Sequence, residues 1–135
     1  MSRSIESIID DFLEQGPYAV VGASRDRAKY GNKVLRAYQQ RQVKVYAVNP
    51  AATEIEGQAV YPDLRSLPER PRGISLITPP RVTESVIAEA IELGVAFAWM
   101  QPGAESAAAI ERAEAGGMEV IADGSCFLVV SGYHE

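Results

Sequence analysis

Tyr18-Ala19-Val20-Val21-Gly22-Ala23-Ser24 joins a short apolar run to an abrupt break at glycine. The apolar run has the composition of a strand, and after a charged loop a segment with helical periodicity begins near Asn32. A strand that ends at a glycine before a helix is typical of a phosphate-binding turn. Glycine lets the backbone approach a phosphate closely, and the free N–H groups at the helix start attract its charge. The stretch therefore predicts a site for a nucleotide-type ligand.

The order of strand, loop and helix recurs along the whole chain. The expected strands cover residues 18–21, 43–48, 58–61, 73–78, 95–100 and 118–122, with 127–130 as a last extended piece. The expected helices cover residues 4–15, 32–42, 82–93 and 104–115, and residues 63–72 hold only a short helical turn. This alternation predicts an α/β fold with a doubly wound, mostly parallel sheet of five to six strands and helices on both faces.

Length and composition restrict the class of protein. The 135 residues are expected to form one domain, 1–135, in which residues 1–16 are an N-terminal helix packed on the rest. The net charge of −5 argues against nucleic-acid binding and against an anionic membrane surface. No apolar run approaches the roughly 18 residues of a membrane span, and the N-terminus lacks a signal-peptide core. A single cysteine, Cys126, suits a reducing compartment, so we expect a cytoplasmic protein.

Ligands of such sheets bind at the carboxyl ends of the strands, so the loops after the strands are the candidate sites. Four cationic residues gather in or just beyond the loop that follows Gly22: Arg25, Arg27, Lys29 and Lys33. A positive patch beside a glycine turn, in an acidic chain, suits a ligand with several phosphates. A solvated charged loop, which also contains Asp26, explains the same cluster equally well.

The sequence departs from two common nucleotide sites. A nicotinamide dinucleotide fingerprint needs G-x-G-x-x-G, but Gly22 is followed by no glycine until Gly31. That fingerprint also needs an acidic residue after the second strand, where this chain has Asn49-Pro50. A cofactor with a 2′-phosphate stays open, because it does not use the acid. A Walker-type ATP site is excluded, because G-x-x-x-x-G-K-[ST] does not occur.

A series of short motifs follows the sequence of one known family in order. They are Val21-Gly22-Ala23-Ser24, Gly31, Val45-Tyr46-Ala47-Val48-Asn49-Pro50, Glu56-Gly57 with Val60-Tyr61, Thr78-Pro79-Pro80, Trp99-Met100-Gln101-Pro102-Gly103 and Val120-Ile121-Ala122-Asp123. The series resembles the small stand-alone CoA-binding domain proteins, which are similar to the N-terminal CoA-binding domain of the succinyl-CoA synthetase α subunit. The resemblance covers about residues 17–130.

The resemblance implies a single Rossmann-like domain that holds coenzyme A or an acyl-CoA across the strand ends. Carried over by position, Gly22, Ala23 and Ser24 would receive phosphate through backbone N–H groups and the serine hydroxyl. Arg25 or Lys29 would pair with phosphate charge.

The same resemblance assigns residues to the rest of the ligand. Asn49 and Pro50 would flank the adenosine end. Gln101 and Gly103 would line the far side, towards the pantetheine arm. The wall along the adenine or the pantetheine would be formed by Thr78, Pro79 and Pro80.

The end of the last strand differs from the family pattern. Similar proteins have Asp, one basic residue and Cys there, whereas this chain has Asp123-Gly124-Ser125-Cys126. Cys126 is interpreted as a structural cysteine, with a nucleophile and a mixed disulfide with CoA as the other readings. The only histidine, His134, lies next to the C-terminus, and one Cys with one His cannot form a zinc site. We therefore expect no catalytic residues and no metal site.

The sequence as a whole favours non-enzymatic binding of CoA or an acyl-CoA. One alternative is an NAD(P)-binding oxidoreductase-like or regulatory domain, and another is a scaffold subunit with a vestigial pocket. A homodimer or an unidentified protein partner is compatible with each reading. Gly22→Val is expected to block phosphate approach and leave the fold largely intact.

Overall fold

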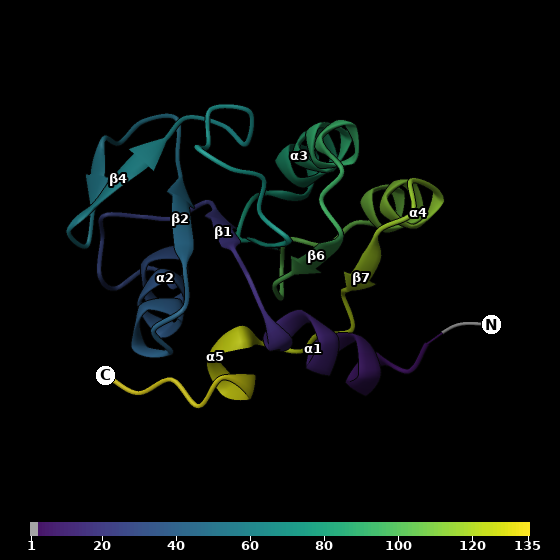
Figure 1. The fold of residues 1–135 in the computed structure, drawn as a ribbon, viewed down its shortest axis with the longest axis horizontal. Coiled ribbons are helices and arrows are strands. Elements are labelled where there is room, and N and C mark those ends of the chain that lie inside the picture. Colours follow the sequence, from purple (N-terminus) through teal and green to yellow (C-terminus); the bar gives the residue numbers. More distant parts are fainter. Residues whose placement is uncertain (1–2) are drawn as a thin grey trace.

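The computed structural model describes residues 3–135 (Figure 1). The helices are α1 (Ile5–Glu14), α2 (Tyr30–Gln40), α3 (Pro80–Leu93), α4 (Ala107–Ala115) and α5 (Phe127–Val130). The strands are β1 (Tyr18–Val21), β2 (Val45–Val48), β3 (Glu54–Ile55), β4 (Gln58–Tyr61), β5 (Gly73–Leu76), β6 (Phe97–Met100) and β7 (Glu119–Ile121). Met1 and Ser2, part of the expected N-terminal helix segment, lie outside the described residues.

All the strands belong to one sheet in the order β3-β4-β2-β1-β5-β6-β7. Every neighbouring pair is parallel except β3 and β4, so the predicted α/β fold with a mostly parallel sheet is confirmed. The sheet has seven strands rather than five to six. The extra strand, β3, pairs antiparallel with β4 and is only two residues long, too short for any periodicity to reveal it.

Helices cover both faces of the sheet, as expected (Figure 1). On one face, α3 and α4 pack on an aliphatic core that includes Ile74, Leu76 and Ile87. On the other, α1, α2 and α5 enclose a core rich in aromatic rings. β1 is buried along its whole length because it lies in the middle of the sheet with helices on both sides.

The expectation that residues 127–130 are extended is wrong, because they form the short helix α5. The Phe127 ring stacks on Tyr38 with the ring centroids 4.1 Å apart, and it meets Trp99 edge-on. Its backbone N–H donates to Gln101 Oε1. These contacts come from distant parts of the chain, so a four-residue apolar segment gives no local sign of them.

Helix α1 is anchored to the sheet by polar as well as apolar contacts. Ser4 caps its start by accepting from the Ser7 N–H. The Arg72 guanidinium, ahead of β5, donates to the backbone oxygens of Asp11 and Gln15. The chain from α1 therefore enters β1 in a fixed position. None of the helices within residues 3–135 is long and apolar enough to cross a membrane.

Candidate functional site

The loops that follow β1, β2, β5 and β6 meet at the carboxyl edge of the sheet, where they enclose a groove. β1 lies between β2 and β5 in the sheet. The chain continues from β1 to β2 and β4 on one side of β1, and then to β5, β6 and β7 on the other side, so the strand order reverses at β1. In open α/β sheets, ligands bind at such a point. Three adjacent cavities, which share lining residues, make up the groove.

The loop cavity, of about 390 Å³, is lined by Gly22, Ala23, Ser24, Lys29, Tyr30, Gly31, Asn49 and Ile77. The proline cavity, of about 340 Å³, is lined by Tyr30, Ile77, Thr78, Pro79, Pro102, Gly103 and Ala104. The apolar cavity, of about 170 Å³, is lined by Val21, Gly22, Val48, Pro50, Pro62, Asp63, Leu64, Thr78, Val82, Val86 and Glu89. Most of the residues predicted from the sequence are thus brought together in one groove.

Two glycines allow the close packing at the centre of the groove. Gly22 has a φ of +97°, and a Cβ added to it would lie 2.1 Å from the carbonyl oxygen of Ile77. A Cβ added to Gly31, in the first turn of α2, would lie 2.1 Å from the carbonyl oxygen of Gly22. Only glycine therefore lets the end of β5 and the start of α2 approach the turn after β1 so closely.

The loop between β1 and α2 is folded into a tight turn. The Ser24 hydroxyl accepts from the Asp26 N–H at 3.1 Å, and Asp26 Oδ1 accepts from the Ala28 N–H at 2.9 Å. Within residues 3–135, no side chain caps the start of α2 at Lys29. Tyr30 and Gly31, the first residues of α2, line the loop cavity, and helix geometry leaves the N–H groups of this first turn without an intrahelical partner, as a site for a phosphate requires.

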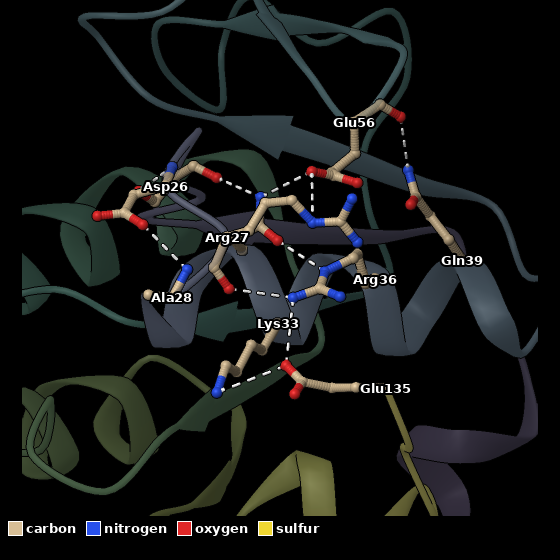
Figure 2. A network of polar contacts seen from close by, with 10 residues as sticks. Asp26, Arg27, Ala28, Lys33, Arg36, Gln39, Glu56 and Glu135 are labelled. Carbon is tan, nitrogen blue, oxygen red and sulfur yellow. Dashed lines mark hydrogen bonds and ion pairs between the residues drawn. The ribbon is translucent and has the colours of Figure 1, made fainter.

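The four cations predicted to surround this loop have different surroundings. Arg27 lies 3.8 Å from Glu56, and Lys33 lies 3.6 Å from Glu135 (Figure 2). Arg25 and Lys29 are exposed and form no ion pair among the described residues. Lys29 lines the loop cavity, whereas Arg25 lines a separate hollow of about 320 Å³ beside the β3–β4 hairpin. Lys29 is thus the cation that lines the groove itself.

Three of the predicted residues line none of the three cavities: Arg25, which lines the separate hollow, and also Gln101 and Pro80. Gln101 is fully buried beneath the groove, where its Oε1 accepts from the Tyr30 hydroxyl at 3.0 Å and from the Phe127 N–H at 2.9 Å. Pro80 begins α3 behind Pro79 and is exposed. The position of Gln101 suits a support for Tyr30 better than a direct ligand contact.

Tyr30 is a groove residue that sequence reasoning missed. Its ring borders both the loop cavity and the proline cavity, and its hydroxyl contacts Gln101 and the Cys126 sulfur. Burial, together with the neighbouring cysteine, raises the pKa of Tyr30, so its hydroxyl stays protonated and donates to Gln101. The only local signal was an aromatic residue directly before Gly31 at the predicted helix start.

The apolar cavity was also missed. Its side chains come from segments far apart in the sequence, including Leu64 after β4 and both Val82 and Val86 on α3. Val82 is 44% exposed although it is apolar. Val82 and Val86 lie four residues apart on one helix, and such a spacing is equally typical of a helix face that packs on a core.

The remaining candidates for chemistry have different surroundings. Cys126 is half-buried against Tyr30, and His134 is exposed at the end of the chain. Hydrogen bonding by the Ser125 side chain, and then by its backbone N–H, which donates to Asp123 Oδ1, lowers the pKa of Asp123. No group of three or more potential metal ligands lies together among residues 3–135.

Comparison with known proteins agrees with this geometry. Residues 17–131 match the family described as the CoA binding domain. The chain is 32% identical over 71 residues to an ADP-forming acetate–CoA ligase I of Archaeoglobus fulgidus, and 29% identical over 89 residues to the α subunit of a Pyrococcus furiosus ADP-forming acetate–CoA ligase II. Those matches cover 53% and 65% of this chain but only 10% and 20% of the two relatives.

Solved structures extend the similarity to most of the chain. A conserved hypothetical protein of Pyrococcus furiosus is 40% identical, with a TM-score of 0.79 over 84% of this chain and 97% of the other. A hypothetical protein of Pyrococcus horikoshii is 25% identical, with a TM-score of 0.88 over 95% of this chain and 89% of the other. An acetyl-coenzyme A synthetase of Candidatus Korarchaeum cryptofilum is 28% identical, with a TM-score of 0.74, and the match covers 84% of this chain and 27% of the enzyme. With its Rossmann-like sheet and its glycine turn, the chain belongs to the CoA-binding domain family.

Proposed function

We propose that this protein binds coenzyme A or an acyl-CoA in the groove at the carboxyl edge of the sheet. The observation that carries the proposal is the turn at Gly22, which opens on a cavity beside the start of α2. Backbone N–H groups at such a turn bind phosphate, and CoA carries a diphosphate and a 3′-phosphate. Membership of the CoA-binding domain family supports the same ligand.

The three cavities suit the three chemically different parts of CoA. The loop cavity, with its backbone groups and Lys29, is assigned to the diphosphate. The apolar cavity, between Pro50 and Val82, is assigned to the adenine ring, because its lining is mainly aliphatic. The proline cavity, between Thr78 and Gly103, is assigned to the pantetheine arm. Arg25, on the outer side of the loop, is available to the 3′-phosphate.

The proposed binding involves no reaction on this chain. Catalysis by Cys126 needs a base to form its thiolate, and His134 lies in the exposed C-terminal segment instead. Cys126 is therefore assigned a structural role beneath the groove. In the cytoplasm, a protein partner or a second copy of this chain would recognise the protein with CoA or acyl-CoA bound.

Titration calorimetry with two matched variants tests the proposed site. Val82→Glu places a carboxylate at the apolar cavity, where it would occupy space and repel phosphate. Val129→Glu introduces the same charge at a valine on α5 that is 79% exposed and outside the groove. We expect Val82→Glu to weaken CoA binding about tenfold or more, and Val129→Glu to leave it unchanged.

Each contrary result has a distinct meaning. If the wild-type protein released no heat and showed no saturation with CoA or acetyl-CoA, CoA binding would be wrong. If the protein bound CoA and Val82→Glu bound it equally well, the ligand would occupy a different place. Saturation with NAD or NADP but not with CoA would favour the nicotinamide cofactor instead.

A further inference from the structure

Asn32 is a fully buried polar residue to which the ligand assignments give no role. It lies in the first turn of α2, and its Nδ2 donates to the Ser24 carbonyl oxygen at 2.9 Å and to Glu56 Oε2 at 3.0 Å. Its Oδ1 accepts from Arg36 Nε at 2.7 Å. Every hydrogen-bonding atom of the carboxamide is therefore used, and one of its bonds reaches the loop after β1.

A second carboxamide holds the preceding carbonyl of the same loop. Asn49, at the end of β2, donates from Nδ2 to the Ala23 carbonyl oxygen at 2.7 Å. Its Oδ1 accepts from the Ala51 N–H at 2.7 Å, which fixes the orientation of the amide. Two consecutive loop carbonyls, those of Ala23 and Ser24, are thus bound by side chains from two different elements.

The orientation of a carbonyl also sets the orientation of the next N–H group. In a trans peptide the C=O and the N–H point in opposite directions. The Ser24 N–H is therefore directed away from Asn49, and the Arg25 N–H away from Asn32. Among residues 3–135, neither N–H has a hydrogen-bond acceptor. Both belong to the loop that borders the loop cavity.

Arg36 and Glu56, the two side chains bonded to Asn32, belong to a larger polar network (Figure 2). Arg36, which donates to Asn32, also donates from Nη2 to the Arg27 carbonyl oxygen at 3.1 Å. Glu56, the other partner of Asn32, lies 3.8 Å from Arg27 Nε and accepts from Gln39 Nε2 through its backbone oxygen at 3.3 Å. The β3–β4 turn and α2 therefore hold the loop from two sides.

We infer that Asn32 and Asn49 are positioning residues that orient two consecutive peptides of the loop, so that the N–H groups of Ser24 and Arg25 receive a phosphate of the ligand. This inference rests on the proposed binding of CoA in the groove. Neither carboxamide needs to touch the ligand. Each binds a carbonyl that would otherwise be free to turn towards the phosphate and repel it.

Two substitutions on α2 distinguish the orientation of the loop peptides by Asn32 from a general effect on the stability of the fold. Asn32→Leu removes the bonds to the loop and to the hairpin with little change in side-chain size. Gln39→Leu is the control, because Gln39 also donates to the hairpin, at the Glu56 carbonyl and at Gln58 Oε1, but contacts no residue of the loop. We expect CoA affinity to fall about tenfold or more in Asn32→Leu and less than about twofold in Gln39→Leu.

A nitrogen-15 spectrum of the wild-type protein tests the same point without a variant, and so covers the case in which Asn32→Leu does not fold. On addition of CoA, the amide proton resonances of Ser24 and Arg25 should move downfield, as expected when an N–H donates to a phosphate. A matched addition of adenosine, which has no phosphate, should leave them unmoved.

Three results would overturn the inference without overturning CoA binding. Equal CoA affinity in Asn32→Leu and the wild type would do so and leave the proposed function intact. Comparable losses in Asn32→Leu and Gln39→Leu would do so as well, because the effect would then act through the hairpin. Unmoved Ser24 and Arg25 resonances in a protein saturated with CoA would show that phosphate binds elsewhere. Absence of CoA binding in the wild type would overturn the proposed function together with this inference.

Discussion

The loops after β1 and β6 each contain a glycine with a φ of +97°, but the surroundings of the two glycines differ. A Cβ on Gly22 would lie 2.1 Å from the Ile77 carbonyl oxygen, whereas a Cβ on Gly103 would have nothing within 4 Å. Both residues border the groove. At Gly103 only the backbone angle favours glycine, while at Gly22 the packing of the sheet requires it.

This difference shows that the two ends of the groove are built in different ways. At the β1 end, Gly22 and Gly31 pack backbone against backbone, and Asn32 and Asn49 hold the loop carbonyls. At the β6 end, Gly103 is exposed and its N–H is held by the Glu105 side chain at 2.8 Å. We therefore expect substitutions at the β1 end to affect the fold and the site together, and those at the β6 end to have smaller effects.

Gly22→Ala should give the largest effect. The added methyl group would collide with the Ile77 carbonyl, and alanine is strained at this φ, so we expect a loss of about 3 kcal/mol or more in the free energy of unfolding. Urea denaturation monitored by circular dichroism measures it. An unchanged midpoint would contradict the close approach. The same contact corrects the expectation that Gly22→Val leaves the fold largely intact.

Gly31→Ala tests the other side of the same packing. In a helix, alanine normally replaces glycine with a gain of up to about 1 kcal/mol. Here the added Cβ would lie 2.1 Å from the Gly22 carbonyl oxygen, so we expect a net loss of about 2 kcal/mol. The same denaturation series provides the value. A more stable Gly31→Ala variant would mean that the start of α2 can move away from the loop.

Gly103→Ala should have a smaller effect on stability. Nothing obstructs the added methyl group, and only the positive φ is unfavourable, so we expect a loss of about 1 kcal/mol. Thermal unfolding of this variant beside Gly22→Ala makes the comparison direct. Equal losses in the two variants would remove the distinction between the two ends of the groove.

Lys29→Ala should have the smallest effect, and on affinity rather than on stability. The side chain is exposed at the loop cavity, so we expect CoA to bind about threefold more weakly, with a difference that shrinks as salt is added. Lys44→Ala is the matched control, since Lys44 lies ahead of β2, at the opposite edge of the sheet, beside Glu69. Calorimetry at low and high salt compares the CoA affinities of the two variants. An equal loss of affinity in both would mean that the net charge of the protein, not the position of Lys29, causes the effect.

Elements with a recognisable apolar pattern could be predicted from the sequence, and the others could not. The continuous apolar residues of β1 and the helical spacing of apolar residues in α3 are such patterns, and both elements lie close to the ranges expected for them. The strand β3 has too few residues to show a period, and α5 depends on the stacking of Phe127 against Tyr38. The pairing of β3 with the neighbouring β4 and the stacking of Phe127 decide these local structures, and neither contact produces a periodic pattern in the sequence.

The candidate site could also be predicted only in part from the sequence. Turn residues at strand ends identified most of the groove, because parallel strands bring their carboxyl ends to one edge. Gln101 has the same kind of position in the sequence, yet its side chain turns inward to Tyr30 and Phe127. The direction of a side chain at a strand end depends on its tertiary partners, so neither the burial of Gln101 nor the contact made by Asn32 has a local signature.

Thermal unfolding with CoA, NAD, NADP and ATP, each added separately at saturating concentration, shows which of these ligands the folded protein binds. A ligand present at about a hundredfold its dissociation constant stabilises the folded state by about 2.7 kcal/mol. In a domain of this size that shift corresponds to roughly ten degrees in the midpoint. We expect this shift with CoA and none with the other three compounds. A shift with a nicotinamide cofactor alone, or with none of the four, would contradict the proposed binding of CoA.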